Sequence, residues 1–587
     1  MEKRVLIAVF LSFLVLYTYQ ALVPSPKPQP ARPQPPAAAT QTQPGAGPAP
    51  DTPPAEPPAR ESTAPATPAA AAASTAVVTE PGERQVTVET SSVIATFTNR
   101  GAQVVSWRLK HYLDSEGRLV DLVPGNLPAG VPRPFALRTE DPVLSERLNT
   151  AIFRVSAGGA PAPDRVQGDR ATELTFDYQD ASGLSARKVF GIPPSGYVVT
   201  YSSRVAEGER VLNPVVLWGP GLGDSVHIAG EGSSFGSYVQ RSQAILYKDG
   251  EVERIADVGQ APSHQGTFPF AGIDDHYFMA TVVEPGLVRV QYEPAQAPVA
   301  GRPEARRDLV AWNVLFAKPP EAARFFVGPK DFEVLRAVHP LLSEAIHFGI
   351  FQVLAVPLLN ALKSINGYIG NYGWSIIILT ILINIVMFPL RHKSVVSMRK
   401  MQELQPQIKA IQERYAKYKA TDPERQKMNA ELMGLYKERG VNPASGCLPM
   451  LLTMPVLFAF YSLLSVAIEM RGAPFALWIR DLSAHDPYYI TPLIMGATMF
   501  WQQRLTPVAD PAQQKIMMLT PIMFLFFFLW APSGLVIYWT VSNLLAIGQQ
   551  YATNRIIGKP VVRQVRPPAE RRLKSAGAGR TENARKA

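Results

Sequence analysis

Residues 372–390 limit the fold more than any other segment, because they form an apolar run that contains no charged residue. A helical membrane span needs about 20 such residues. Inside a bilayer the backbone must satisfy its own hydrogen bonds, so this run predicts a transmembrane helix. Similar apolar segments occupy residues 447–468, 489–500, 516–530 and 535–551. Together with an N-terminal segment they predict a polytopic α-helical membrane protein with six transmembrane helices.

The N-terminal segment begins with Lys3 and Arg4, which precede an apolar stretch over residues 5–23. A cleaved signal peptide is one interpretation, but the apolar core is long and no small-residue cleavage motif closes it. We therefore expect residues 1–23 to be an uncleaved signal anchor. Residues 24–85 are rich in Pro and Ala, and such a composition buries too little apolar surface to fold, so we expect a disordered linker.

Residues 86–330 alternate apolar and polar side chains in short runs separated by turn residues, which predicts an all-β sandwich domain. In the following region, residues 331–370, apolar residues recur at helical spacing and predict an amphipathic helix that lies in the membrane interface. A transmembrane span broken at Pro357 is the alternative. The apolar face consists of Phe351, Leu354, Leu358, Leu362 and Ile365.

The orientation follows from the basic residues, which exceed the acidic ones by ten over the whole chain. Residues 391–445 hold twelve Lys or Arg and six acidic residues, and the tail 553–587 is also strongly basic. Short basic segments next to spans stay in the cytoplasm. Six spans with a cytoplasmic N-terminus place both segments and the C-terminus inside, and place the β domain outside. The five-span core then covers residues 371–552.

The cytoplasmic segment 391–445 contains apolar residues that step by three and four, which is the spacing of a heptad seam. We expect a helical hairpin of the coiled-coil type, and an ordinary solvated helical loop is the alternative. The predicted seam residues are Met401, Leu404, Ile408, Ile411, Tyr415 and Tyr418.

Catalytic chemistry has no recognisable motif in this sequence. The single cysteine, Cys447, excludes an intrachain disulfide and a cysteine-cluster metal site. No histidine spacing typical of a metal site, no phosphate-binding loop and no nucleophile elbow is found. We therefore expect no enzyme activity, no metal and no cofactor, and the basic charge comes without a nucleic-acid-binding motif.

Polar residues inside the apolar runs are the strongest functional indication. Thr380, Asn384 and Arg391 are separated by four and seven residues and share one helix face. Asn543 and Gln550 repeat the seven-residue spacing in the last span. Such residues either hydrogen-bond to neighbouring helices or line a wet pocket that opens to the cytoplasm. Weaker candidates for the same pocket are Thr453, Gln502, Gln503 and Gln550.

The segments "GNYGWSIIILT", "VNPASGCLPMLLTMPVLFAFY", "APFALWIRDLSAHDPYYI", "DPAQQKIMMLTPIMF" and "PSGLVIYWTVSNLL" follow one another from residue 370 to residue 545. In this order they resemble the YidC/Oxa/Alb family of membrane protein insertases, in the Gram-negative form with a large periplasmic domain. The resemblance implies a protein of the bacterial inner membrane, with a periplasmic β domain. It also implies a function: moving hydrophobic segments of nascent proteins into the membrane through a hydrophilic groove open to cytoplasm and lipid. The implied partners are nascent membrane proteins, the Sec translocon, the lipid bilayer and, through the cytoplasmic loops and basic tail, the ribosome.

The resemblance also implies groove positions, and one of them departs from the family. Thr380, Tyr538 and Trp539 stand where groove residues are expected. Asn384 stands where family members usually carry a basic residue. Our hypothesis is that Asn384 keeps the groove wet while Arg391 supplies the charge nearer its mouth. The alternative is that Arg391 only reaches the lipid headgroups.

Two other functional classes fit parts of the sequence. The polar residues within the spans are compatible with a solute transporter or channel, and the β domain is compatible with a carbohydrate-active enzyme held by the first span.

Overall fold

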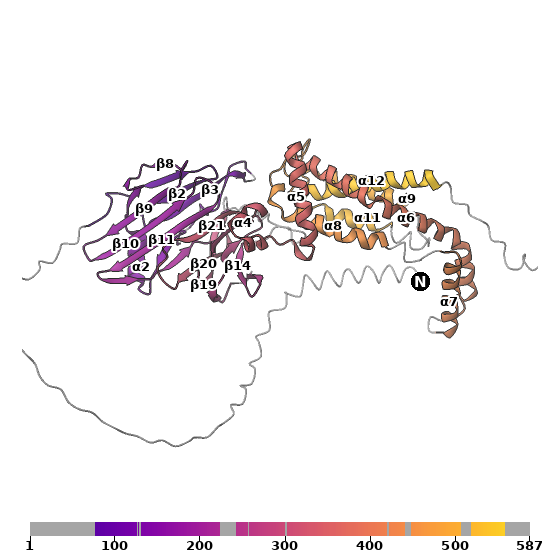
Figure 1. Ribbon diagram of the computed structural model, residues 1–587, viewed down its shortest axis with the longest axis horizontal. Coiled ribbons are helices and arrows are strands. Elements are labelled where there is room, and N and C mark those ends of the chain that lie inside the picture. The colour runs from indigo at the N-terminus through magenta and orange to yellow at the C-terminus, as the bar shows by residue number, and fades with distance from the viewer. Residues whose placement is uncertain are drawn as a thin grey trace, which may run out of the picture. The chain divides into compact units, whose positions relative to one another are not determined.

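The computed structural model describes residues 77–557 except 115, 126, 128–130, 224–241, 256–257, 300–301, 419–421, 441–447 and 506–517. The expected signal anchor, almost all of the linker, Cys447 and most of the basic tail lie outside the described residues. Strands follow one another up to Pro329, and helices dominate from Phe332 to Ile557 (Figure 1). We refer to these two parts as the β half and the helical half.

The β half contains three sheets of mostly antiparallel strands. The first has the order β4-β3-β2-β1-β8, and the second, with eleven strands, runs β15-β14-β17-β18-β21-β11-β10-β9-β6-β7 with β12 beside β11. The third has the order β16-β19-β20-β13-β5. The strands are β1 (Gln85–Glu89), β2 (Val93–Thr98), β3 (Gln103–Leu113), β4 (Leu119–Asp121), β5 (Ala136–Arg138), β6 (Arg154–Ala157), β7 (Ala160–Pro161), β8 (Arg165–Gln167), β9 (Thr172–Gln179), β10 (Leu184–Ile192), β11 (Val198–Glu207), β12 (Arg210–Leu212), β13 (Val215–Trp218), β14 (Gln243–Lys248), β15 (Glu251–Ile255), β16 (Ser263–Thr267), β17 (Phe270–Asp274), β18 (Phe278–Val283), β19 (Leu287–Val299), β20 (Arg302–Phe316) and β21 (Ala323–Pro329).

Aromatic side chains from different sheets meet in one core, as the predicted sandwich requires. Phe97 of β2 packs on Phe190 of β10, with ring centroids 4.9 Å apart. Trp218 and Trp312 stack at 6.1 Å, and Trp312 also contacts Phe325 of β21. Burial of such large rings is the main stabilising contribution of a sandwich core. The β-rich prediction for this part of the chain is therefore confirmed.

Lys188 is the exception to the apolar inward face of β10. Its side chain is fully buried, and the ammonium donates to the carbonyls of Gly101 at 2.6 Å, Ala102 at 3.2 Å and Phe135 at 2.8 Å. These three residues all have positive φ, so their backbone turns the carbonyls toward one point. Burial lowers the pKa of Lys188 to about 7. Lys188 thus satisfies three backbone carbonyls in the interior of the sandwich.

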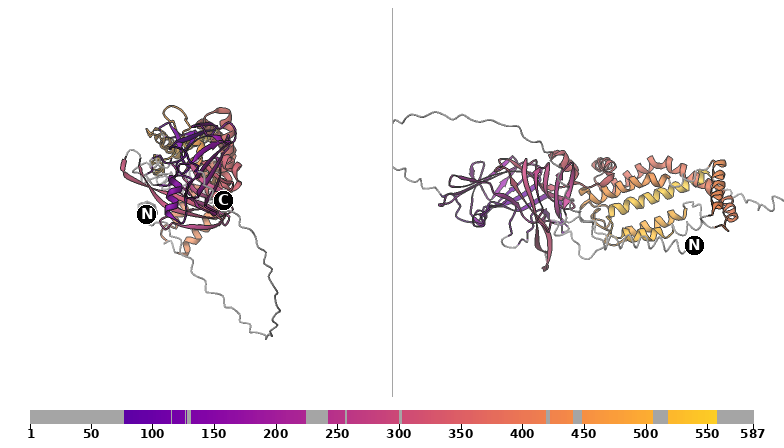
Figure 2. Two further views of the ribbon diagram at one scale, coloured as in Figure 1. Left: turned by 90° about the vertical axis from the view of Figure 1, so that its left-hand side faces the viewer. Right: turned by 90° about the horizontal axis from the view of Figure 1, so that it is seen from below.

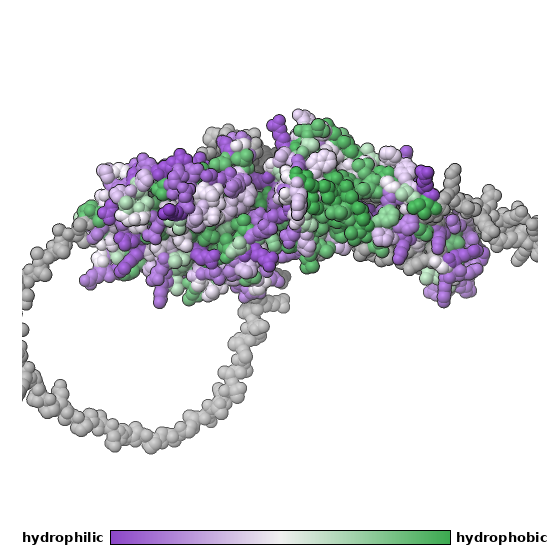
Figure 3. Space-filling view, turned by 45° about the horizontal axis from the view of Figure 1, so that its top comes forward, coloured by the Kyte–Doolittle hydropathy of each residue, from purple (hydrophilic) through white to green (hydrophobic). Residues whose placement is uncertain are grey.

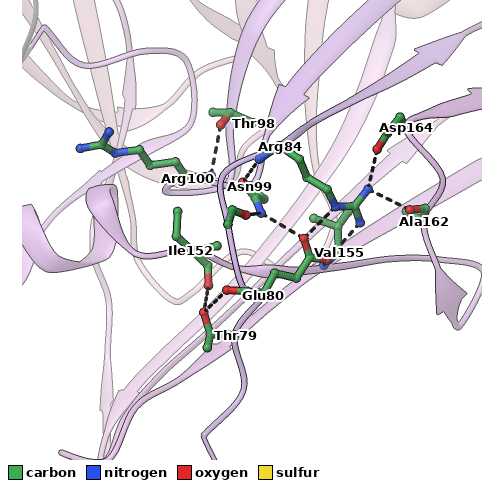
Figure 4. A network of polar contacts seen from close by, with 11 residues as sticks. Thr79, Glu80, Arg84, Thr98, Asn99, Arg100, Ile152, Val155, Ala162 and Asp164 are labelled. Carbon is green, nitrogen blue, oxygen red and sulfur yellow. Dashed lines mark hydrogen bonds and ion pairs between the residues drawn. The ribbon is translucent and has the colours of Figure 1, made fainter.

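The first described residues are anchored to the sandwich by a network around Glu80 (Figure 4). Arg84 donates to both carboxylate oxygens of Glu80, at 2.7 and 3.0 Å, and to the Ala162 carbonyl at 2.9 Å. The Glu80 carboxylate also accepts hydrogen bonds from the Val155 amide at 2.9 Å and from Asn99 at 3.0 Å. Burial raises the pKa of Glu80, but these hydrogen bonds outweigh it and leave the pKa below its ordinary value. The chain therefore enters the domain at a fixed point.

The helical half consists of helices that run side by side (Figures 1 and 2). Its elements are α4 (Phe332–Val338), η1 (Pro340–Ala345), η2 (Gly349–Phe351), α5 (Gln352–Ile369), α6 (Tyr372–Arg414), α7 (Pro423–Glu438), α8 (Leu448–Val466), η4 (Ile468–Met470), α9 (Ile490–Leu505), α11 (Thr520–Phe528) and α12 (Ser533–Ile557), while the short helix α2 (Pro142–Thr150) belongs to the β half. Each predicted span of the core coincides with one of α6, α8, α9, α11 and α12. Among the described helices, one segment, Tyr372–Ser397 of α6, is both long and apolar enough to cross a membrane.

Helix α6 differs from the prediction in its length. We expected the span to end at residue 390 and the cytoplasmic hairpin to begin at residue 391, but one helix runs from Tyr372 to Arg414. Pro389 has no N–H, so the carbonyl one turn earlier loses its helical donor without ending the helix. Tyr415 and Tyr418, predicted to continue the hairpin seam, lie beyond this helix end, with their rings 6.2 Å apart.

The hairpin forms between the end of α6 and α7. Met401, Leu404 and Ile408 of α6 form a small cluster of their own. Ile411, one turn further along the predicted seam, is also buried. The partly buried residues that pack against the cluster from α7 are Leu432, Leu435 and Tyr436. The charged outer faces of the two arms are connected by an ion pair between Arg414 and Glu431 at 2.8 Å.

Helix α5 continues through Pro357, so the alternative of a span broken at this proline is not what the structure shows. It buries Leu362, while Leu354 of the predicted apolar face is 40% exposed and the adjacent Val353 is 83% exposed. Lys363, which is not part of the predicted apolar face, is 19% exposed and points into the protein. The helix therefore has apolar side chains both against the protein and on its surface.

Lys363 lies at the junction between the two halves. Its ammonium is 3.4 Å from Asp331 at the start of α4, 3.4 Å from Glu333 and 3.2 Å from Glu469 of η4. Glu469 is 7% exposed and Glu333 is 67% exposed. Burial and the nearby Asp331 raise the pKa of the Glu469 carboxyl, and Lys363 opposes this rise. We call Lys363, Asp331 and Glu469 the junction cluster.

A second contact between the halves is made by His276, between β17 and β18. Its Nε2 is 2.7 Å from the Ser465 carbonyl near the end of α8. Burial lowers the pKa of His276 to about 4, so the ring is neutral and its Nε2–H donates. The last carbonyls of a helix have no intrahelical donor, so His276 caps α8 from the β half.

The segment between η4 and α9 is fastened to the first turns of α6 and α12. Asn371 donates to the Phe475 carbonyl at 3.0 Å, and the Gly534 amide donates to the Leu482 carbonyl at 2.9 Å. A Cβ added at Gly373 would overlap the Phe475 ring. The close approach therefore requires glycine at this position.

Candidate functional site

Thr380, Asn384 and Arg391, which we call the polar row, form a continuous chain of hydrogen bonds along α6. The Thr380 hydroxyl donates to the Ile376 carbonyl at 2.6 Å. The Asn384 amide nitrogen donates to the Thr380 carbonyl at 2.8 Å. The Arg391 guanidinium donates to the Asn384 side-chain oxygen, also at 2.8 Å. Sequence spacing predicted the common face, and the structure connects all three residues.

The polar row faces inward, while the opposite side of α6 is an exposed apolar surface. Thr380 is fully buried, whereas Asn384 and Arg391 are partly buried. Val386 follows Asn384 by two residues, about 200° around the helix, and is 76% exposed. In the space-filling view hydrophobic residues gather over the helical half, and hydrophilic ones cover most of the β half (Figure 3). This pattern fits a helix that touches lipid on one side and protein on the other.

The predicted residues of α12 face three different neighbours. Tyr538 stacks on Phe460 of α8, with ring centroids 4.4 Å apart. Trp539 packs on Phe528 of α11 at 4.9 Å. Asn543 donates to the Thr498 hydroxyl of α9 at 3.3 Å. Asn543 thus connects two helices, which is the first of the two interpretations given to such residues above.

The structure does not bring Asn543 to the polar row through any hydrogen bond between described residues. Tyr538 does lie within range of electrostatic interaction with Arg391. Gln550 donates within α12, to Asn554 at 3.0 Å. Gln503 of α9 has a buried side-chain nitrogen without a hydrogen-bond partner among the described residues. The side chain of Thr453 lies outside what the structure describes.

Two contacts between α6 and α12 were not predicted. His392 lies 3.3 Å from the Thr553 hydroxyl, between the ring Nδ1 and the hydroxyl oxygen. Gln549 donates to the Phe388 carbonyl at 3.4 Å. In each of these contacts the two residues are about 160 positions apart in the sequence. Sequence spacing has no means of pairing residues across such a distance.

Metal chemistry finds no support in the described part of the chain, where no group of three or more His, Cys, Asp and Glu side chains could hold an ion. The candidate site consists of hydrogen-bonding and charged groups.

A β-sandwich joined to a bundle of apolar helices, one of them with an internal polar row, defines a class of membrane proteins with a large domain outside the bilayer. The family model "60Kd inner membrane protein" matches residues 364–560, and "YidC periplasmic domain" matches residues 85–361. The chain belongs to the YidC family of membrane protein insertases.

Relatives from curated collections extend over nearly the whole chain. A protein named membrane protein insertase YidC from Geotalea daltonii is 35% identical, with 94% of this chain and 99% of that protein covered. One of the same name from Geobacter metallireducens is 36% identical, with 95% and 99% covered. A crystal structure of an active YidC insertase is 18% identical and covers 82% of this chain and 95% of that chain, with a TM-score of 0.33.

Proposed function

We propose that this chain is an insertase that moves hydrophobic segments of nascent proteins into the bacterial inner membrane. One observation carries the proposal: α6, which is apolar and long enough to cross a membrane, holds a hydrogen-bonded row of polar side chains on its inward face. The names of the relatives that cover nearly the whole chain support the same function.

The polar row offers a route for the hydrophilic flank of a substrate. Placing an unpaired polar group in hydrocarbon costs several kcal/mol, roughly 4–8 kcal/mol for a group with no hydrogen-bond partner. A groove lined by the polar row would hydrate or hydrogen-bond the flank, while the apolar segment leaves along the exposed face that carries Val386. We propose that this groove opens to cytoplasm and lipid, with Tyr538 and Trp539 on its α12 side.

We further propose the topology predicted above: six spans, both termini in the cytoplasm and the β half in the periplasm. The basic segment 391–445 and the short loop before α9 support this arrangement through the positive-inside rule. The hairpin of α6 and α7 and the basic tail are proposed contacts for the ribosome and the emerging chain. Insertion beside the Sec translocon belongs to the proposal as well. No step requires catalysis.

Reconstitution tests the function directly. The purified chain in liposomes should insert a single-span test protein, scored by protease protection, without releasing a trapped small dye. Insertion at the level of empty liposomes would contradict the proposal. Dye uptake without insertion would favour the solute transporter or channel. Removal of residues 86–328 should leave most of the insertion activity, whereas an enzyme carried by the β half would lose all function.

A further inference from the structure

The segment between η4 and α9 presents an apolar side chain to its surroundings on a tightly fixed turn. The Phe475 amide donates to the Ile479 carbonyl at 3.0 Å, and the Ile479 amide donates to the Ala476 carbonyl at 3.1 Å. Leu477 lies at the tip of the turn that these two hydrogen bonds close. Its side chain is 88% exposed, whereas Ile479 is buried. The turn therefore holds Leu477 outward, and we call residues 474–489 the 477 loop.

The backbone of Leu477 has an unfavourable conformation, with φ at 57°. A bulky side chain rarely adopts this left-handed region, which glycine and asparagine occupy more readily. Tyr489, at the other end of the loop, has φ at 56°. These two are the non-glycine residues with positive φ among the described residues of the helical half. Such conformations persist where the surroundings impose them, and they are concentrated at functional positions.

Asp486 fixes the loop from inside. Its side chain is 1% exposed, and the carboxylate accepts hydrogen bonds from the Trp478 indole at 2.9 Å, the Tyr488 amide at 2.9 Å and the Thr491 amide at 2.7 Å. Hydrogen bonds to a charged acceptor are stronger than those between neutral groups. Because Trp478 follows Leu477 directly, the same carboxylate keeps the tip of the turn in place.

The 477 loop packs beside the first turn of α6, the helix that is apolar and long enough to cross a membrane. The Phe475 ring contacts Trp374 of α6, with ring centroids 5.5 Å apart. Trp374 is 50% exposed, and Tyr488, whose ring contacts Trp478, is 65% exposed. Tryptophan and tyrosine are enriched where a span meets the water at the bilayer surface. The loop therefore lies where α6 enters the bilayer.

The apolar surface of the loop continues along α6. Ile378 and Leu382 follow Trp374 at steps of four residues, so the three lie on one face of the helix. All three are exposed. An apolar stripe on a membrane-crossing helix faces lipid, and the 477 loop extends this stripe at its outer end.

The charges of the 477 loop suit a phospholipid surface. Arg480 is exposed and lies three residues after Leu477. The Asp481 carboxylate accepts hydrogen bonds from the amide and the hydroxyl of Ser483, at 2.8 and 2.7 Å, and Asp486 is buried. The loop thus presents a guanidinium, which pairs well with phosphate, next to an exposed leucine.

We propose that the 477 loop is an anchor in the leaflet on the side of the β half, where Leu477 inserts among the acyl chains and Arg480 binds headgroup phosphates. Trp374 and Tyr488 lie at the interface, and the anchor fixes the depth at which α6 enters the bilayer. This inference goes beyond the proposed function, because it concerns the attachment of the helical half to lipid.

Quenching of a fluorophore by brominated lipids tests the insertion of Leu477. In a Cys447→Ser background, Leu477→Cys is labelled with NBD and the full chain is reconstituted in phosphatidylethanolamine and phosphatidylglycerol vesicles. Bromine on the acyl chains should remove most of the fluorescence of this label. A label at Val143→Cys, on α2 of the β half, is the matched control, since Val143 is an apolar residue that is 66% exposed. Its fluorescence should not change.

A second label, at Ile378→Cys, tests whether the loop fixes the depth of α6. Leu477→Asn tolerates the left-handed backbone but has no apolar side chain to insert. In this variant the outer end of α6 should move toward water, so bromine near the headgroups should quench the Ile378→Cys label more and bromine at mid-chain should quench it less. Leu477→Met keeps an apolar side chain and should leave both values unchanged.

Three results would overturn the inference. A Leu477→Cys label that acyl-chain bromine does not quench would show that the loop does not enter lipid. A photoreactive residue at position 477 that crosslinks in cells to a protein or to a second copy of this chain, and not to lipid, would make the loop a protein-docking surface. An unchanged depth of Ile378→Cys in Leu477→Asn would show that the loop does not position α6. None of these readouts measures insertion of a substrate, so they stand apart from a failure of the proposed function.

Discussion

Replacement of Lys363 by Met should loosen the contact of α5 with the start of α4 and with η4. The ammonium faces the partly buried carboxylate of Asp331 at 3.4 Å and the buried carboxylate of Glu469 at 3.2 Å. Removing one partner of a buried ion pair leaves an uncompensated charge and costs about 3–5 kcal/mol. Glu333 is 67% exposed and adds little. Met is uncharged, so the variant no longer carries the cost of desolvating the ammonium, which offsets part of this loss. We therefore expect the local stability of α5 to fall by about 3 kcal/mol.

Hydrogen exchange of the full chain in lipid nanodiscs measures this loss locally. About 3 kcal/mol corresponds to a roughly hundredfold decrease in the protection of the α5 amides. The difference in α5 protection between Lys363→Met and the native chain should shrink as the pH falls from 8 to 5. Burial raises the pKa of the Glu469 carboxyl, and without Lys363 it lies higher still, so protonation removes the uncompensated charge of the variant. In the native chain the same protonation only weakens an ion pair.

Two further variants complete the experiment on the junction cluster. Glu469→Gln in the Lys363→Met background should restore much of the protection, because the buried charge is gone. Lys409→Met is the matched control, since Lys409 is 74% exposed and pairs with Glu413 at 4.0 Å. Unchanged protection in Lys363→Met, or a deficit that grows toward pH 5, would refute the reasoning.

Three other expectations follow from the described contacts. The pKa of Lys188 is about 7 in the folded chain and 10.5 in the unfolded chain, so the unfolded chain binds more protons between these two pH values. The stability of the native chain should therefore rise with pH in this range. In Lys188→Met the thermal midpoint should no longer rise between pH 7 and 9. Gly373→Val should displace the Phe475 ring and destabilise the protein by about 1–3 kcal/mol. The segment between η4 and α9 should then be cleaved faster by proteases. An unaltered cleavage rate would argue against the close packing. Leu404→Ala should destabilise the hairpin by about 2 kcal/mol or more and raise hydrogen exchange in α7, whereas equal exchange would mean that the cluster does not hold the two arms together.

The helices of the core were predictable because their signal lies within single segments. The apolar run of α6 and the spacing of Thr380, Asn384 and Arg391 specify a helix and one of its faces. The same spacing does not say in which direction a long side chain extends. That Arg391 reaches back to Asn384 depends on side-chain orientation, which a sequence pattern leaves open.

Contacts between distant segments were not predictable in the same way. Lys363 lies on an amphipathic helix but outside the apolar face predicted for it. It turns inward because carboxylates from α4 and η4 surround it, and neither lies near it in sequence. The pairing of Asn543 with Thr498 likewise depends on the packing of α12 against α9. Local pattern thus predicts elements, and tertiary contacts decide the environment of their polar residues.

Photocrosslinking from α6 to a stalled nascent chain tests the central claim, that the polar row receives the substrate. A photoreactive residue placed at Asn384 should crosslink to the hydrophilic flank of the nascent membrane protein. The same residue at Val386, on the exposed apolar side of the helix, should crosslink to its hydrophobic segment or to lipid. Crosslinks to the flank from Val386 with none from Asn384 would contradict the account.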